Sequence, residues 1–193
     1  MTLATTTLTQ PFARDTWKRT AYLLLAVPTG LLCIPLGLVA PRSAGRIQLA
    51  LAGRLLGGGG PEGPRAQRPR TGALAFAHAV LTVPVNLAAA VVTFYLWSIV
   101  AMNLGYPLRP GLDTENSWGG PSLAGAWALH AGVGGLGFLL LTPWVVRGFS
   151  ALQARLVAGF LSTGQAGLGR TVGLALGVSA VCAVLCVPVV HQL

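Results

Sequence analysis

Four apolar stretches, each long enough to cross a bilayer as a helix, constrain the fold of this chain more than any other feature. They cover residues 20–40, 73–103, 123–146 and 171–190. A helix needs about 20 mainly apolar residues to cross the hydrocarbon core, and every stretch reaches that length. Only 9% of the residues are charged, whereas a soluble domain carries about 25%. The sequence therefore predicts an all-α integral membrane protein, with residues 1–193 forming a single membrane domain.

The basic residues indicate how these stretches are oriented. Twelve of the 13 Lys and Arg residues precede the first stretch, separate the first from the second, or separate the third from the fourth. Lys and Arg favour the cytoplasmic side of a membrane. We therefore expect a multi-pass protein of the cell membrane, with a cytoplasmic N-terminus and an external loop at 104–122. Because the basic residues act here as topological signals, we expect no binding to nucleic acid.

The first stretch has basic residues on both flanks, so a single crossing would place one basic flank outside. It also contains Pro28, Gly30, Pro35 and Gly37, which interrupt helical hydrogen bonding. We expect residues 20–40 to form a broken, re-entrant hairpin that enters and leaves on the cytoplasmic side and turns between Pro28 and Pro35. Such backbone is tolerated at membrane depth only where other helices bury it. A kinked span with an external N-terminus is the alternative.

Two parts of the chain resemble each other. LLAVPTGLL, which begins at residue 24, matches VLTVPVNLA, which begins at residue 80. PRSAGRIQLALAGRLLG, which begins at residue 41, matches VRGFSALQARLVAGFLS, which begins at residue 146. In this alignment Arg42 matches Arg147, and Gln48 matches Gln153. Such self-similarity indicates two diverged copies of one unit.

The two copies define the expected organisation of the chain. Residues 17–57 and 73–162 would each form a membrane hairpin followed by a cytoplasmic amphipathic helix, with a Gly/Pro/Arg linker at 58–72 between them. Residues 171–190 would add a further transmembrane helix. The expected fold is thus a broken or re-entrant N-terminal hairpin plus three transmembrane helices.

In the second copy, the apolar residues of the amphipathic segment share one helical face: Phe149, Leu152, Leu156 and Phe160. Arg147 and Arg155 lie away from that face. This pattern predicts a helix at the membrane surface, with its apolar side in lipid and its arginines near anionic headgroups. A helix that caps the bundle is an equally compatible alternative.

The second stretch carries polar residues within one quadrant of a helix: His78, Thr82, Asn86, Thr93 and Trp97. Polar groups are costly in lipid, so we expect this quadrant to face the bundle. Hydrogen bonding between helices is favoured there over ligand binding. Asn86, together with Tyr95, nevertheless stays a candidate ligand-binding residue.

The densest group of reactive and aromatic side chains surrounds the external loop. Trp127 and His130 are one turn apart near the outer end of the third stretch, and Trp118 precedes them, close to Asp113 and Glu115. A histidine beside carboxylates can bind cations, relay protons or donate to an anionic ligand. We expect Trp118, Trp127 and His130 to form a ligand-binding wall, although tryptophans also favour membrane interfaces without any ligand.

We expect no cofactor and no metal site. His78 and His130 should lie at opposite ends of the membrane, so they cannot hold one metal ion together. The two cysteines of the fourth stretch, Cys182 and Cys186, have no third or fourth ligand near them in the sequence.

Three motifs stand out around the third stretch. They are SWGGP at 117–121, LAGAW at 123–127 followed by His130, and TPWVVRG at 142–148 followed by Leu152 and Gln153. They resemble the actinobacterial sensor domain, a family of membrane modules usually found ahead of histidine kinases. The resemblance covers about residues 17–162 and implies two membrane hairpins, each followed by a cytoplasmic amphipathic helix. This chain departs from the family because its first hairpin is shortened and a further apolar segment stands where a kinase would follow.

We therefore expect a sensor-like regulatory protein that binds a small apolar or amphiphilic ligand near its outer face and signals to a separate kinase or transporter. A homodimer would suit a sensor, and the G-x-x-x-G spacing of Gly173 and Gly177 predicts close helix packing, within the bundle or between two copies. The alternative is a membrane-embedded enzyme acting on a lipid-like or prenylated substrate, for example by acid-initiated cyclisation. Asp113 or Glu115 would then supply the acid, and aromatic faces would stabilise the cation.

Overall fold

The computed structural model describes residues 7–57, 72–112, 114–161 and 167–190. The helices are α2 (Arg14–Val39), α3 (Pro41–Leu56), α4 (Gly72–Leu81), α5 (Val83–Leu104), α6 (Leu123–Leu129), the π-helix η3 (His130–Gly137), α7 (Phe138–Leu161) and α8 (Leu168–Val190). There are also two 3-10 turns, η1 (Gln10–Phe12) and η2 (Tyr106–Leu108), and residues 7–9 before η1 are helical; the described residues contain no strand. The predicted all-α fold class is confirmed.

Helices of membrane-spanning length and composition occur where the apolar stretches predict them. Arg14–Val39, Val83–Leu104, Leu123–Leu161 and Leu168–Val187 are each long and apolar enough to cross a bilayer. The third of these is continuous through α6, η3 and α7. The chain therefore has the architecture of a multi-pass membrane protein.

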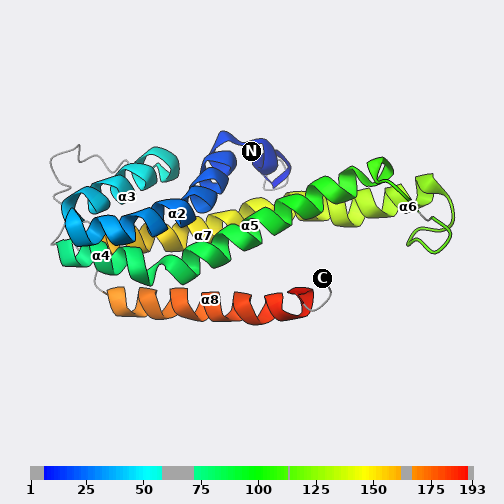
Figure 1. The fold of residues 1–193 in the computed structure, drawn as a ribbon. Helices are drawn as coiled ribbons and strands as arrows, with labels where there is room; N and C mark the ends of the chain where they lie inside the picture. Colours follow the sequence, from blue (N-terminus) through cyan, green and yellow to red (C-terminus); the bar gives the residue numbers. More distant parts are fainter. Residues whose placement is uncertain (1–6, 58–71, 113, 162–166, 191–193) are drawn as a thin grey trace.

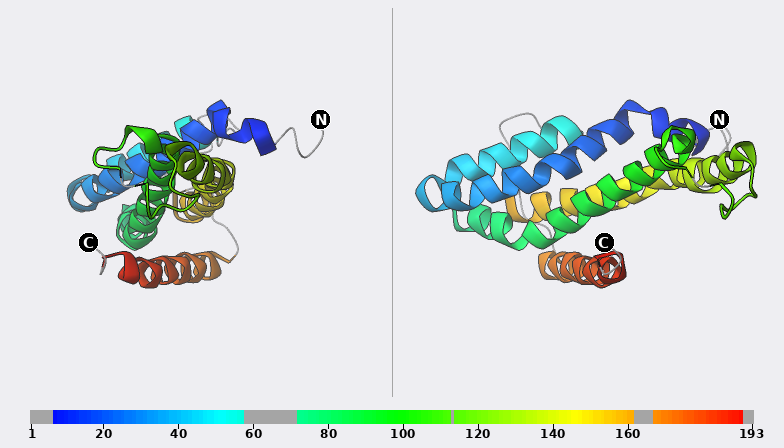
Figure 2. Two further views of the ribbon diagram at one scale, coloured as in Figure 1. Left: turned by 90° about the vertical axis from the view of Figure 1, so that its right-hand side faces the viewer. Right: turned by 45° about the vertical axis from the view of Figure 1, so that its right-hand side comes forward.

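The long antiparallel pair formed by α5 and the continuous helix α6–η3–α7 is the axis of the molecule (Figure 1). At one end, α2, α3 and α4 pack around the C-terminal half of α7, and we call this the bundle end. At the other end, η2, α6 and the loop between them form the hairpin end. Helix α8 contacts α5 and α7. It crosses them obliquely: the left view of Figure 2 shows α8 from the side, whereas α5 and α7 are foreshortened in the same view.

The predicted reversal between Pro28 and Pro35 is wrong. Helix α2 continues through both prolines from Arg14 to Val39, and the chain reverses only at Ala40. Prolines are tolerated inside such a helix where neighbouring helices enclose it, and α3, α4, α5 and α7 all pack against α2. Ala40 leaves the helical conformation because it precedes Pro41, which then begins α3. The N-terminal hairpin is therefore helix α2 paired with helix α3.

The apolar face of the amphipathic segment in α7 lies in the protein core and not in lipid. Phe149, Leu152, Leu156 and Phe160 are at most 9% exposed. They belong to one cluster with Leu23 of α2 and Val85 of α5. The prediction that this face contacts lipid is wrong, because α2, α3 and α4 cover it. The segment is the C-terminal half of α7 and does not form a separate amphipathic helix after the hairpin.

Glycines allow α5 and η3 to approach each other closely at the hairpin end. A Cβ atom at Gly134 would lie 2.4 Å from the side chain of Asn103, and one at Gly135 would lie 2.5 Å from that of Leu104. By contrast, a Cβ atom at Gly173 or Gly177 would meet no described atom within 4 Å. The α8 glycines therefore do not pack closely against the other described helices. Their packing between two copies of the chain stays a prediction.

This contrast predicts opposite effects of two neighbouring glycine substitutions. Gly134→Ala should lower the free energy of unfolding by about 1–3 kcal/mol, because the methyl group overlaps Asn103. Gly132→Ala, whose Cβ meets open space, should leave it unchanged or raise it by up to about 1 kcal/mol through helix propensity. Denaturant unfolding of the detergent-solubilised protein measures both. Equal effects at the two positions would contradict the close approach.

Candidate functional site

A pocket at the hairpin end combines apolar walls with a few polar groups. It has a volume of about 360 Å³ and lies between α5, the loop before α6, and η3. Its walls are formed by Ile99, Asn103, Trp118, Leu129, His130, Val133, Gly134 and Phe138. A cavity of this size with few polar groups is typical of a site for a small organic molecule. We call it the hairpin pocket.

His130 is held in one orientation in this pocket. Its Nδ1–H donates to the carbonyl oxygen of Ala126 at 2.9 Å, and its ring stacks on Tyr106 with centroids 4.1 Å apart. Tyr106 in turn bonds Ser117 at 3.1 Å and lies 5.2 Å beneath the guanidinium of Arg109. Because Nδ1 carries the hydrogen of this bond, Nε2 is the ring nitrogen left to accept one. A ligand that donates a hydrogen bond can therefore be recognised there.

The structure separates the sequence-predicted site residues. Trp118 and His130 line the hairpin pocket, and Trp118 is 81% exposed. Trp127 is outside its walls and donates its indole N–H to the carbonyl oxygen of Leu104 at 3.0 Å, which ties α6 to the end of α5. Asn86 lies at the bundle end, and Tyr95 is half-exposed on α5 away from the pocket. Of the two loop acids, Asp113 lies outside the described residues, and Glu115 is not part of the described pocket wall.

Sequence reasoning missed the α5 side of the pocket and the π-helix. Ile99 and Asn103 are joined by a hydrogen bond from the Asn103 amide to the Ile99 carbonyl oxygen at 2.8 Å. The wall opposite them belongs to η3, whose sequence HAGVGGLG is unusually rich in glycine. π-Helical turns are rare and are often found at functional sites. The glycine run was the signal that could have indicated an irregular helix here.

Two other cavities lie under α8, with volumes of about 310 Å³ against α5 and about 410 Å³ against α7. The first offers only Ser179 and two cysteine thiols as polar groups, and the second only the guanidinium of Arg155. Neither combines an imidazole, an amide and an indole as the hairpin pocket does. They resemble gaps between apolar helices more than a recognition site.

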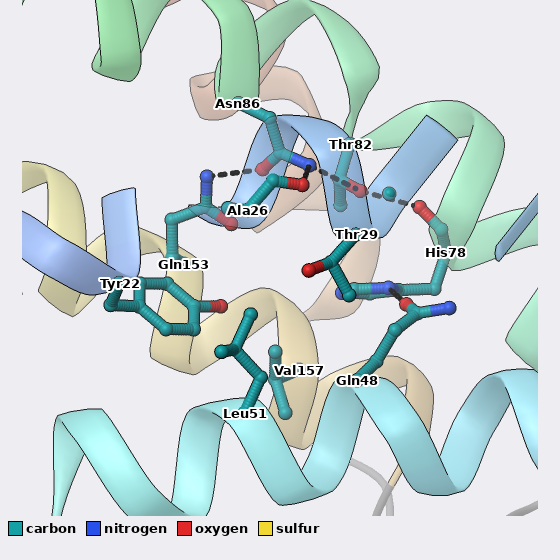
Figure 3. Close-up of a pocket in the computed structure, with 11 residues that line it drawn as sticks. Tyr22, Ala26, Thr29, Gln48, Leu51, His78, Thr82, Asn86, Gln153 and Val157 are labelled. Carbon is teal, nitrogen blue, oxygen red and sulfur yellow. Dashed lines mark hydrogen bonds between the residues drawn. The ribbon is translucent and has the colours of Figure 1, made fainter. Parts of the chain in front are cut away.

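A polar cluster occupies the interior of the bundle end (Figure 3). His78, Thr82 and Asn86 are at most 5% exposed, which confirms that their quadrant faces the bundle. The Gln153 amide donates to Asn86 Oδ1 at 2.5 Å, and the Asn86 amide donates to the carbonyl oxygen of Ala26 at 3.2 Å. These bonds connect α7, α5 and α2, so Asn86 provides the hydrogen bonding between helices that the sequence predicts. The hydroxyl of Thr93, in the same quadrant, has no partner among the described residues.

On the other side of the cluster, His78 and Gln48 are joined by a hydrogen bond between Nδ1 and Oε1. The imidazole also meets the edge of the Phe160 ring at a centroid distance of 5.6 Å. His78 is in α4, outside the four membrane-length helices, and burial lowers its pKa to about 4. The ring is therefore neutral at pH 7, with its proton on Nδ1 because Oε1 of Gln48 can only accept.

An ionic contact fixes the start of α2 against α7. Asp15 lies 2.7 Å from Arg19 and 3.9 Å from Arg147. Arg19 also donates to the hydroxyl of Ser150 at 2.9 Å. The position of α7 along α2 is thus set by charged groups as well as by apolar packing.

The described residues contain no group of three or more His, Cys, Asp or Glu side chains that could hold a metal ion. His78 and His130 lie at the bundle end and the hairpin end respectively. Comparison with known protein families, characterised proteins and solved structures gives no match for the chain. The resemblance to the sensor domain therefore stays a prediction from its motifs, and function must be argued from the sites themselves.

The hydrogen bond between Asn86 and Gln153 should be measurable by a double-mutant cycle. We expect a coupling free energy of about 0.6–1.7 kcal/mol between Asn86→Ala and Gln153→Ala, as for other hydrogen bonds between membrane helices. Asn103→Ala, at the far end of α5, serves as the matched control and should add to Gln153→Ala within about 0.5 kcal/mol. Unfolding in detergent gives each free energy; additivity of the first pair would show that the bond contributes nothing.

Proposed function

We propose that this chain is a membrane-embedded regulatory protein that binds a small amphiphilic ligand in the hairpin pocket and transmits its presence through α7. One observation carries the proposal: His130, Val133 and Gly134 line the pocket and also belong to the π-helix that continues into α7. A ligand in the pocket therefore contacts the segment whose geometry sets the position of α7.

The chemistry of the pocket defines the class of ligand. Ile99, Val133 and Phe138 favour an apolar body, while the acceptor nitrogen of His130 favours a polar head that donates a hydrogen bond. A protonated carboxylic acid or an alcohol at the end of a hydrocarbon chain meets both demands. Acid-initiated cyclisation would need a carboxylic acid of the protein in the pocket, and none of the described wall residues is Asp or Glu; we do not propose it.

The π-helix offers a route from ligand to output. Its hydrogen bonds run from residue i to i+5, so a change of part of η3 to α-helical bonding alters the length and rotation of the segment. Helix α7 would then shift against α2 and α5. Ser150 and Gln153 are the α7 residues whose contacts with Arg19 and Asn86 such a shift would break.

The position of Trp127 supports a location of the pocket in the outer leaflet. Trp127 lies at the hairpin end and is about half exposed. Tryptophans favour membrane interfaces, so we place the hairpin end at the outer interface. Following the basic residues, we place the N-terminus on the cytoplasmic side, where a separate kinase or transporter would receive the signal.

Binding can be tested with a brominated long-chain alcohol, which quenches the fluorescence of nearby tryptophans. We expect saturable quenching that is lost in Trp118→Phe, and an affinity at least about fivefold lower in His130→Leu, equivalent to about 1 kcal/mol. Leu136→Ala changes an exposed η3 residue outside the pocket wall and is the control. Quenching that is equal in all four proteins would refute a ligand site in the hairpin pocket.

Transmission can be tested separately by electron spin resonance distances. In a background lacking Cys33, Cys182 and Cys186, spin labels at Phe12→Cys and Arg155→Cys report α7 against the N-terminal region. We expect the alcohol probe to change this distance and to leave that between Phe12→Cys and Ile47→Cys of α3 unchanged. Probe binding without any change in the first distance would mean that the pocket does not act through α7.

A further inference from the structure

The start of the described chain carries large apolar side chains on its outer surface. Leu8 is 61% exposed, Phe12 is 74% exposed and Trp17 is 50% exposed. They come from the residues before η1, from η1 itself and from the first turn of α2. In the left view of Figure 2 this part of the chain, drawn in dark blue, projects from the side of the molecule. Exposed apolar side chains that lie close together indicate a surface that contacts lipid or another protein.

Two basic side chains lie beside these apolar groups. Arg14 and Lys18 are both exposed and are one turn apart on α2, and Trp17 lies between them on the same side of the helix. The nearby carboxylate of Asp15 pairs with other partners, Arg19 and Arg147. The charges of Arg14 and Lys18 are therefore available to an anion outside the protein. We call Leu8, Phe12, Arg14, Trp17 and Lys18 the N-terminal patch.

The opposite side of this segment is fixed to the rest of the protein. Gln10 is 7% exposed, Pro11 is fully buried, and η1 contacts α7. The hydroxyl of Thr16 donates to the carbonyl oxygen of Gln10 at 2.7 Å. Trp17 stacks on Trp97 of α5, with ring centroids 4.6 Å apart. These contacts hold the backbone in place, so the N-terminal patch is presented to its surroundings as one surface.

We propose that the N-terminal patch binds the surface of a bilayer that contains anionic lipids. Leu8, Phe12 and Trp17 enter the boundary between the headgroups and the acyl chains, and the two basic side chains contact headgroup phosphates. Aromatic and aliphatic side chains combined with Lys and Arg are typical of segments that lie in a membrane interface. The patch adjoins α2, a helix long and apolar enough to cross a bilayer, so a lipid surface is within its reach.

Other partners explain the patch less well. A protein would need apolar groups and free carboxylates at matching positions, whereas an anionic bilayer offers both chemistries over its whole surface. A zwitterionic bilayer offers the apolar layer but lacks the excess negative charge that attracts Arg14 and Lys18. Each basic side chain close to an anionic membrane surface strengthens binding about fivefold. The composition of the patch therefore favours anionic lipid.

The proposal can be tested by electron spin resonance of the full chain in nanodiscs of phosphatidylcholine, with or without phosphatidylglycerol. A spin label at Phe12→Cys, in a background lacking Cys33, Cys182 and Cys186, collides with oxygen in lipid or with a nickel chelate in water. We expect phosphatidylglycerol to raise the ratio of oxygen to nickel collisions at least about threefold. High salt should reverse this rise, because it screens the charges. A label that the nickel chelate reaches equally in both nanodiscs overturns the proposal.

A second pair of basic residues provides a matched control. Arg42 and Arg46 are also exposed and one turn apart, but they lie at the start of α3, next to the C-terminal end of α2. Arg14→Gln combined with Lys18→Gln should abolish the difference between the two nanodiscs, whereas Arg42→Gln combined with Arg46→Gln should preserve it. An equal loss in both double variants means that total charge attracts the lipid, and it overturns the proposal. If a double variant does not fold, the comparison of the two nanodiscs with the labelled parent protein still decides.

Discussion

Gly134 and Gly135 bring η3 against the end of α5, and the Gln153–Asn86 hydrogen bond joins the same two long helices at the opposite end. Backbone polar groups inside a membrane protein must be satisfied within the protein, so two helices held together in this way provide a frame on which less regular parts can be built. The pair contains the π-helix, and the proline-containing α2 packs on it. Without this pair, neither the hairpin pocket nor the polar cluster at the bundle end would be enclosed.

The sequence predicted features that depend on local periodicity and missed those that depend on helix pairing. The polar residues that share one quadrant of the second apolar stretch predicted that His78 and Asn86 lie in the interior, because polar side chains are costly in lipid. The periodicity also predicted the apolar face that contains Phe149 and Phe160. Lipid and a protein core are both apolar, however, so periodicity alone could not decide whether lipid or other helices cover this face. Packing of α2, α3 and α4 decided the matter.

The hairpin pocket shows the same division. Trp118 and His130 are close in the sequence, and their grouping could be read from it. Asn103 joins them only because α5 and η3 are antiparallel with a particular register, which no local pattern specifies. Likewise, Pro28 and Pro35 looked like positions of chain reversal, but the residue at which the chain reverses is Ala40, which precedes Pro41.

The close approach of α2 to Asn86 limits which residues the two helices can carry. A Cβ atom at Gly30 would lie 3.0 Å from the amide nitrogen of Asn86. With asparagine at 86, position 30 has no room for a large side chain. A larger residue in α2 at this point therefore requires a smaller one in α5, so the two positions can be changed only together.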